Sequence, residues 1–137
     1  MNDLIQRITN AIFRQEGESH ENPNPGNLRD CPWFPRNTKG ERYYPANLKP
    51  GDVAELVKYA GGFWVPRSRA EGESGAAHVV ALHIAEGDSL RKLISIWAPP
   101  ADKNNTEAYI ANVKNWAQIP DENLPLWNFL KPAISAS

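Results

Sequence analysis

The sequence predicts an α+β fold that is mainly helical, formed by one domain of residues 1–137 with a small irregular or β lobe after the first helix. A length of 137 residues suits one domain of ordinary size, and 41% apolar residues are enough to bury a core. Apolar residues recur at helical spacing in the first helix and in the second half of the chain. By contrast, six of the 12 prolines fall within residues 19–51, where they exclude a long helix.

The first helix is expected over residues 3–16. Its apolar residues follow helical spacing from Leu4 to Ile12, Asp3 is the expected cap, and Gly17 ends it. Further helices are expected over residues 52–60, 74–87, 88–98, 105–119 and 126–130, capped in the first four cases by Asp52, Ser74, Asp88 and Asn105. A short β-hairpin is expected near residues 41–44, and an extended or loop stretch over residues 63–69.

The segment 74–87 is apolar on nearly all sides, which places it in the middle of the core. Five tryptophans divide by context. Those at 97, 116 and 127 fall on apolar helix faces and are expected in the core. Trp33 and Trp64 lie in irregular segments and are the candidates for an exposed stacking surface.

Composition excludes several classes of function. With 15 Lys and Arg against 16 Asp and Glu, the net charge of −1 argues against a nucleic-acid binder. The single cysteine, Cys31, cannot form an internal disulfide. There is no apolar run of the ~20 residues that a membrane span needs, and no signal peptide, so cytoplasmic synthesis is expected. No phosphate-binding or dinucleotide motif occurs, and no cofactor is expected.

His78 and His83 are five residues apart on one predicted helix. This spacing turns them about 140° away from each other, so they do not face one metal ion as an i,i+4 pair would. We therefore expect one buried, hydrogen-bonded histidine and one exposed histidine, and no metal site.

Glu16 has the most informative setting in the chain. It ends an apolar helix and is followed by a loop rich in Asn, Pro and Gly. Partial burial of a carboxyl at such a boundary would raise its pKa and suit it to general acid catalysis. The alternative is a solvated residue in a last helical turn, where a carboxylate opposes the helix dipole.

The motifs around Glu16 resemble a known family. E-G at residues 16–17 followed by N-P-G-N-L-R at 24–29 is similar to the signature of the phage and prophage lysozyme-like proteins, the muramidases of the phage structural-protein type that are related to lytic transglycosylases. Later segments agree in order: G-F-W at 62–64, R-A-E-G at 69–72, G-A-A-H-V-V-A-L at 75–82, L-I-S-I-W-A-P-P at 93–100 and N-N-T-E-A-Y-I at 104–110. The resemblance covers about residues 5–130.

This resemblance implies a lysozyme-like fold and cleavage of the β-1,4 bond between N-acetylmuramic acid and N-acetylglucosamine, with Glu16 as the catalytic acid. A lytic transglycosylase needs no second carboxylate, whereas a lysozyme uses one. The candidates for a second carboxylate are Glu18, Asp30, Glu41 and Glu71, each of which is otherwise a surface charge.

The candidates for substrate binding are Asn27, Phe63, Trp64, Asn105, Thr106 and Tyr109. Several have a structural alternative. Asn105 or Thr106 is equally suited to cap a helix, Phe63 or Trp64 to lie in the core, and Asn27 to brace the loop beneath Glu16 through backbone hydrogen bonds.

The competing class is non-catalytic: a virion or tail structural protein, or a peptidoglycan-binding protein, on the same fold. In either case the expected partner is the glycan strand of peptidoglycan, with no nucleic acid, no membrane insertion and a monomeric chain. The protein is then expected to reach the cell wall after release from the cytoplasm, as an endolysin, or as part of a virion.

Overall fold

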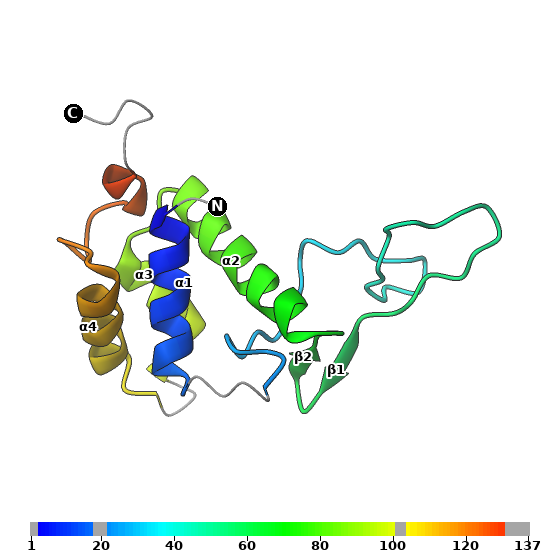
Figure 1. The fold of residues 1–137 in the computed structure, drawn as a ribbon, viewed down its shortest axis with the longest axis horizontal. Helices are drawn as coiled ribbons and strands as arrows, with labels where there is room; N and C mark the ends of the chain where they lie inside the picture. The colour runs from blue at the N-terminus through cyan, green and yellow to red at the C-terminus, as the bar shows by residue number, and fades with distance from the viewer. Residues whose placement is uncertain (1–2, 18–21, 101–103, 131–137) are drawn as a thin grey trace. The chain divides into compact units, whose positions relative to one another are not determined.

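The computed structural model describes residues 3–17, 22–100 and 104–130, and it has the α+β, mainly α, architecture that the sequence predicts. Its elements are α1 (Asp3–Gln15), β1 (Lys58–Ala60), β2 (Phe63–Val65), α2 (Arg69–Ala85), α3 (Leu90–Trp97), α4 (Thr106–Ala117) and the 3₁₀-helix η2 (Leu126–Phe129) (Figure 1). No helix in these ranges is long and apolar enough to cross a membrane.

The chain forms two compact units. The first consists of Met1–Glu18 and Ala76–Ser137, and the second of Ser19–Gly75. Helix α2 begins in the second unit and ends in the first, so this one helix belongs to both.

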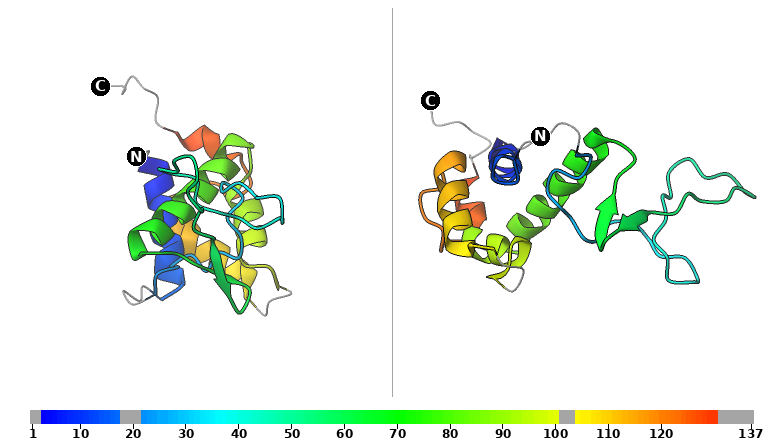
Figure 2. Two further views of the ribbon diagram at one scale, coloured as in Figure 1. Left: turned by 90° about the vertical axis from the view of Figure 1, so that its right-hand side faces the viewer. Right: turned by 90° about the horizontal axis from the view of Figure 1, so that it is seen from below.

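The first unit packs its helices around one apolar core. Helix α1 contributes a stripe of buried residues from Leu4 to Ile12 and lies beside α4, which also contacts α3 (Figures 1 and 2). The core consists of Leu4, Ile8, Ala11, Ile12, Val80, Ile84, Leu90, Leu93, Ile94, Ala98, Tyr109, Ile110, Val113, Ala117, Ile119 and Leu126. Helix α1 ends at Gln15, one residue before the predicted end, and Asp3, the expected cap, is its first residue. The predicted cap of α4 by Asn105 is confirmed.

The turn between α2 and α3 differs from the prediction at one position. Ser89, rather than Asp88, is the N-cap of α3, because its side chain accepts a hydrogen bond from the Lys92 amide. Asp88 instead completes the end of α2. Its amide donates to the His83 carbonyl, and the amide of Gly87, with φ of 79°, donates to the Ile84 carbonyl. These two bonds define a Schellman motif.

The second unit is organised by the side chain of Asn24, which is 5% exposed. Its amide nitrogen donates to the carbonyls of Leu28 and Trp64 at 2.9 and 3.0 Å, and its Oδ1 accepts from the Leu28 amide at 3.0 Å. One side chain thus closes the Pro-rich loop and connects it to β2.

The predicted helix over residues 52–60 is wrong. Residues 58–60 form β1, which pairs antiparallel with β2 in the register Tyr59 to Trp64. Gly61 and Gly62, both with positive φ, make the two-residue turn, a geometry that glycine allows and that suits a tight hairpin. The expected hairpin at 41–44 is replaced by isolated bridges, among them Tyr43 with Leu56.

Helix α2 begins five residues before the predicted cap. Ser68 caps it, because its hydroxyl accepts from the Glu71 amide at 3.1 Å. The early start brings Gly72 against the Pro-rich loop, where a Cβ atom would lie 1.8 Å from the Pro23 carbonyl oxygen. The segment is also less buried than predicted, since the apolar residues Leu82 and Ala85 are exposed.

Two tryptophans depart from their expected surroundings. Trp64 is 2% exposed and is therefore a core residue of the second unit, packed edge-on against Trp33. Trp127, expected in the core, is 50% exposed and lies against Gly87. Trp97 and Trp116 pack at the edge of the first unit's core, in agreement with the prediction.

Candidate functional site

Glu16 directly follows the last residue of α1. Its amide still donates to the Ile12 carbonyl at 3.0 Å, so the helical path continues to this residue. Gly17 then takes a φ of 102°, which an L side chain rarely adopts, and the helix ends. Glu16 is half-buried, with the core residues of α1 on one side of it. The setting matches the boundary position that the sequence indicates.

Tyr109 of α4 provides a buried hydrogen-bond donor to this carboxyl. Its hydroxyl donates to Glu16 Oε1 at 3.1 Å, and the tyrosine is only 4% exposed. Burial raises the pKa of Tyr109, and the adjacent Glu16 charge raises it further. The phenol therefore keeps its proton at any physiological pH and is a permanent donor to Oε1. A hydrogen bond from a rigid buried ring fixes the orientation of the carboxyl group.

Neighbouring contacts hold the end of α1 on α4. Gln15 Oε1 accepts from Asn112 Nδ2 at 2.9 Å. The guanidinium of Arg14 lies 4.3 Å from the centre of the Trp116 ring, a cation–π contact. Residues 14, 15 and 16 thus meet residues 116, 112 and 109 in antiparallel order. Because α4 presents its partners at positions i, i+3 and i+7, they lie on one helix face.

Asn105 and Thr106 both have structural roles at the start of α4. The Asn105 side chain accepts from the Ala108 amide at 3.1 Å and is the N-cap. Thr106 is buried, and its hydroxyl donates to the Ala98 carbonyl at 2.7 Å, which joins α4 to the end of α3. The capping alternative therefore holds for Asn105, whereas Thr106 anchors α4 to the end of α3, and both bonds position Tyr109 one turn further along.

The two aromatic candidates of β2 differ in exposure. Trp64 is buried, its indole nitrogen donates to the Tyr44 hydroxyl at 3.5 Å, and its ring contacts Gly75, so it cannot act as a stacking surface. Phe63 is exposed, with the Arg29 guanidinium 4.4 Å from the centre of its ring. Phe63 stays a predicted stacking residue.

Asn24 and Asn27, the two asparagines of the N-P-G-N motif, have different surroundings. Asn27 is exposed and adopts the left-handed conformation with φ of 52°. Asn24, three residues earlier in the same motif, makes the buried hydrogen bonds that close the loop. Asn24 is therefore a structural residue that the sequence analysis did not select, and the role of Asn27 stays a prediction.

Asp30 and Glu41, two of the candidates for a second carboxylate, line the same pocket of the second unit, with a volume of about 480 Å³. The Asp30 carboxylate accepts hydrogen bonds from Nε and Nη2 of Arg42, at 2.9 and 3.1 Å. It also accepts from the Tyr59 hydroxyl at 3.1 Å. The hydrogen bonds from Arg42 hold the pKa of Asp30 below its usual range. Glu41 accepts from Asn37 at 3.3 Å and is exposed.

Glu71, the third candidate, is the centre of a structural network. It accepts from the Arg67 guanidinium at 2.6 and 2.9 Å, from the Arg67 amide at 2.9 Å and from the Tyr44 hydroxyl at 2.9 Å. Burial alone would raise the pKa of Glu71, but these hydrogen bonds outweigh burial and the pKa lies below its usual value. Glu18 lies outside the described residues.

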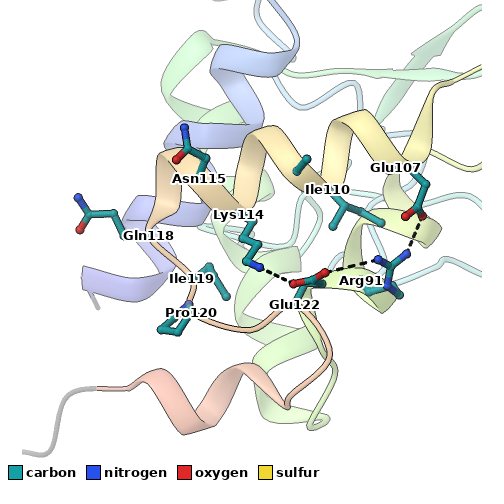
Figure 3. Close-up of a pocket in the computed structure, with 10 residues that line it drawn as sticks. Arg91, Glu107, Ile110, Lys114, Asn115, Gln118, Ile119, Pro120 and Glu122 are labelled. Carbon is teal, nitrogen blue, oxygen red and sulfur yellow. Dashed lines mark hydrogen bonds and ion pairs between the residues drawn. The ribbon is translucent and has the colours of Figure 1, made fainter.

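A further pocket of about 550 Å³ lies on the first unit, along α4 (Figure 3). Its charges are balanced: Arg91 pairs with Glu107 at 2.6 Å and with Glu122 at 3.7 Å, and Lys114 pairs with Glu122 at 2.7 Å. It contains none of the residues that the sequence analysis selected. With each charged side chain engaged in an ion pair, the pocket offers no evident catalytic group.

The histidines follow the expected division. His83 is largely buried, and its Nδ1 lies 2.7 Å from Asp88 Oδ2, whereas His78 is exposed. Among the described residues, one group has the ligand types and spacing to hold a metal ion, namely His83, Glu86 and Asp88, whose ligand atoms all lie within 4.8 Å of one another. The helical spacing of His78 and His83 does not predict this group.

Comparison of the chain with protein-family models, curated proteins and solved structures finds no match.

Proposed function

We propose that this protein is a muramidase that cleaves the β-1,4 bond between N-acetylmuramic acid and N-acetylglucosamine in peptidoglycan, with Glu16 as the general acid. The observation that carries the proposal is the half-buried Glu16 carboxyl at the end of α1, oriented by the buried hydroxyl of Tyr109 at 3.1 Å. The resemblance of the E-G and N-P-G-N-L-R motifs to the phage lysozyme-like family supplies the substrate class.

In the proposed reaction, the protonated Glu16 carboxyl donates its proton to the glycosidic oxygen as the bond from that oxygen to the muramyl C1 breaks. Positive charge develops at C1 as in an oxocarbenium ion. The muramyl 6-hydroxyl then attacks C1, and its proton passes to the Glu16 carboxylate. The products are a 1,6-anhydromuramyl end and a new N-acetylglucosamine hydroxyl end, and the acid is regenerated.

We favour this transglycosylase route over hydrolysis because of the contacts of the candidate second carboxylates. Asp30 and Glu71 each accept several charge-assisted hydrogen bonds from an arginine. Such bonds lower the basicity and nucleophilicity of a carboxylate. Glu41 is exposed, so water solvates its carboxylate and competes with it for the muramyl C1 carbon. A mechanism that needs only Glu16 makes no demand on these three residues.

The activity test measures the loss of turbidity of purified cell walls with wild type, Glu16→Gln and Glu107→Gln. Glu107 is the matched control, since it is an exposed glutamate of α4 near Tyr109. We expect wild-type and Glu107→Gln activity to be alike, and Glu16→Gln to lose ~10²-fold or more, the scale of a general acid contribution. Equal rates in wild type and Glu16→Gln would contradict the proposal.

Tyr109→Phe tests the positioning role of the hydroxyl in the same assay. The ring stays in the core, so the fold is retained, while the bond to Glu16 is lost. We expect kcat to fall about tenfold with KM unchanged, since a positioning residue acts on the reactive geometry rather than on binding. An unchanged kcat would remove Tyr109 from the proposed site.

The same experiment addresses the non-catalytic alternative. Sedimentation of the protein with insoluble walls, with no turbidity loss by any variant, would make it a peptidoglycan-binding or virion component. In the catalytic case, the protein acts on the wall after release from the cytoplasm or as part of a virion.

A further inference from the structure

The C-terminal end of α2 brings three side chains of metal-ligating type together through its backbone. In a Schellman motif, the side chains at positions C3 and C″ lie close to each other and are commonly apolar. Here these positions are His83 and Asp88, and their Nδ1 and Oδ2 atoms are 2.7 Å apart. Glu86 occupies the position between them, and the ligand atoms of all three lie within 4.8 Å of one another.

The electrostatics of this position favour a cation. The carbonyls at the end of a helix carry a partial negative charge, and Glu86 and Asp88 add two carboxylates to it. The Asp88 side chain is only 6% exposed, so little water screens its charge. Lys92 is a nearby positive group, and its Nζ lies 3.2 Å from Asp88 Oδ1. The other carboxylate oxygen, Oδ2, is the one that contacts His83.

We propose that His83, Glu86 and Asp88 bind one divalent transition-metal ion of the Zn²⁺ class. Zinc takes imidazole and carboxylate ligands at about 2.0–2.2 Å in a tetrahedral arrangement, with water in a remaining position. The imidazole and the Asp88 carboxylate already face each other, so a metal replaces the proton between them after they separate by a fraction of an ångström. The exposed Glu86 side chain is free to turn inward as the third ligand.

The bound ion would join three elements. Asp88 precedes α3, and its carbonyl accepts from the Leu126 amide of η2 at 2.9 Å. Trp127 of η2 lies against Gly87, in the middle of the loop that carries the ligands. A metal at this loop therefore stabilises the junction of α2, α3 and η2, away from Glu16 at the end of α1.

The experiment is isothermal titration of untagged protein with ZnCl₂, together with thermal unfolding in the presence and absence of zinc. We expect one Zn²⁺ per chain with micromolar affinity and a rise in Tm of several degrees, because the ion binds the folded state. His83→Gln should abolish saturable binding. Glu86→Gln should weaken it about tenfold without affecting the fold, since Glu86 is exposed.

Two controls make the test specific. His78→Gln removes an exposed histidine of the same helix and should leave zinc binding unchanged. Lys92→Gln removes the competing ammonium from Asp88 and should strengthen binding, an effect that non-specific surface binding would not give. The proposal is overturned if wild type shows no saturable binding of one ion per chain, or if Glu86→Gln and His83→Gln bind zinc as wild type does.

The site is independent of the proposed muramidase activity. Glu16→Gln should retain zinc binding in full, so failure of one proposal leaves the other intact.

Discussion

At the scale of single residues, Asn24 shows how one buried amide can determine a loop that has little secondary structure. It donates to the carbonyls of Leu28 and Trp64 and accepts from the Leu28 amide, and the Leu28 carbonyl also accepts from the Trp64 amide at 2.9 Å. An unpaired buried backbone group costs about 1–3 kcal/mol. The Pro-rich loop therefore depends on the hydrogen bonds of this side chain.

Asn24→Ala should lower the free energy of unfolding by about 2–4 kcal/mol, because three buried hydrogen bonds are lost and water cannot replace all of them. Urea unfolding followed by tryptophan fluorescence measures the loss, since Trp64 is one of the partners. Asn104→Ala removes one exposed hydrogen bond and should cost less than about 1 kcal/mol. Equal losses in the two variants would contradict this account of the loop.

Glu71 links charge to stability in the same unit. Its pKa is lower in the folded protein than the usual value of 4.5. The unfolded state therefore binds more protons at acidic pH, so the stabilisation by this carboxylate is complete above about pH 4.5 and is lost as pH falls through the folded pKa.

Glu71→Gln should destabilise the protein by about 1–2 kcal/mol at pH 7, because the Arg67 and Tyr44 donors lose their charged acceptor. The difference from wild type should shrink as the pH is lowered from 5 towards about 3. Urea unfolding across this pH range is the measurement. Glu73→Gln, which removes a more exposed carboxylate of α2, is the control. If the difference in free energy of unfolding between wild type and Glu71→Gln does not change with pH, the lowered pKa of Glu71 does not contribute to stability, and this account is contradicted.

At the scale of elements, the helices of the first unit were predictable because their apolar spacing is regular. Errors arose where contacts distant in sequence determine the structure. The pair Asp52 and Glu55 suggests a helix start. The backbone of this segment instead pairs with residues 42–44, since the Glu55 carbonyl accepts from the Tyr44 amide and the Val57 amide donates to the Arg42 carbonyl. The Gly-Gly pair at 61–62, which also suits the end of a helix, is typical of a two-residue hairpin turn.

The start and the end of α2 depend on pairs of residues, so a single candidate cap residue does not locate them. Ser68 and Glu71 have the spacing of a capping box, and this pair, rather than Ser74, marks the start of α2. Likewise, His83, Glu86 and Asp88 meet across a helix end, where the 100° rule for helical spacing no longer applies. Spacing could therefore separate His78 from His83 but could not bring His83 together with Asp88.

Gly72→Ala tests the close approach of α2 to the Pro-rich loop. The added Cβ would lie 1.8 Å from the Pro23 carbonyl oxygen, which is backbone and must move. We expect a loss of about 2–4 kcal/mol, at the upper end of the cost of overpacking, despite the better helix propensity of alanine. Thermal unfolding measures it, with Ser74→Ala on the exposed side of the same helix as control. Comparable stability of both variants would exclude the steric argument.

At the scale of the whole molecule, the candidate acid and its donor belong to one unit although they are 93 positions apart in sequence. The sequence could indicate Glu16 and Tyr109 separately, each within its own motif. Their hydrogen bond follows from the antiparallel packing of α1 on α4, which no local pattern reveals. The candidate second carboxylates Asp30, Glu41 and Glu71 belong to the other unit.

Mass spectrometry of the muropeptides released from purified walls tests the central claim most directly, because it reads the chemistry at the muramyl C1 carbon. If Glu16 acts alone as acid and base, wild-type protein releases fragments with 1,6-anhydromuramyl ends, and Glu16→Gln releases them ~10²-fold more slowly or not at all. Fragments with reducing muramic acid ends would show that the bond is hydrolysed and that no transglycosylase step takes place. Release of the same fragments by Glu16→Gln at the wild-type rate would contradict the account.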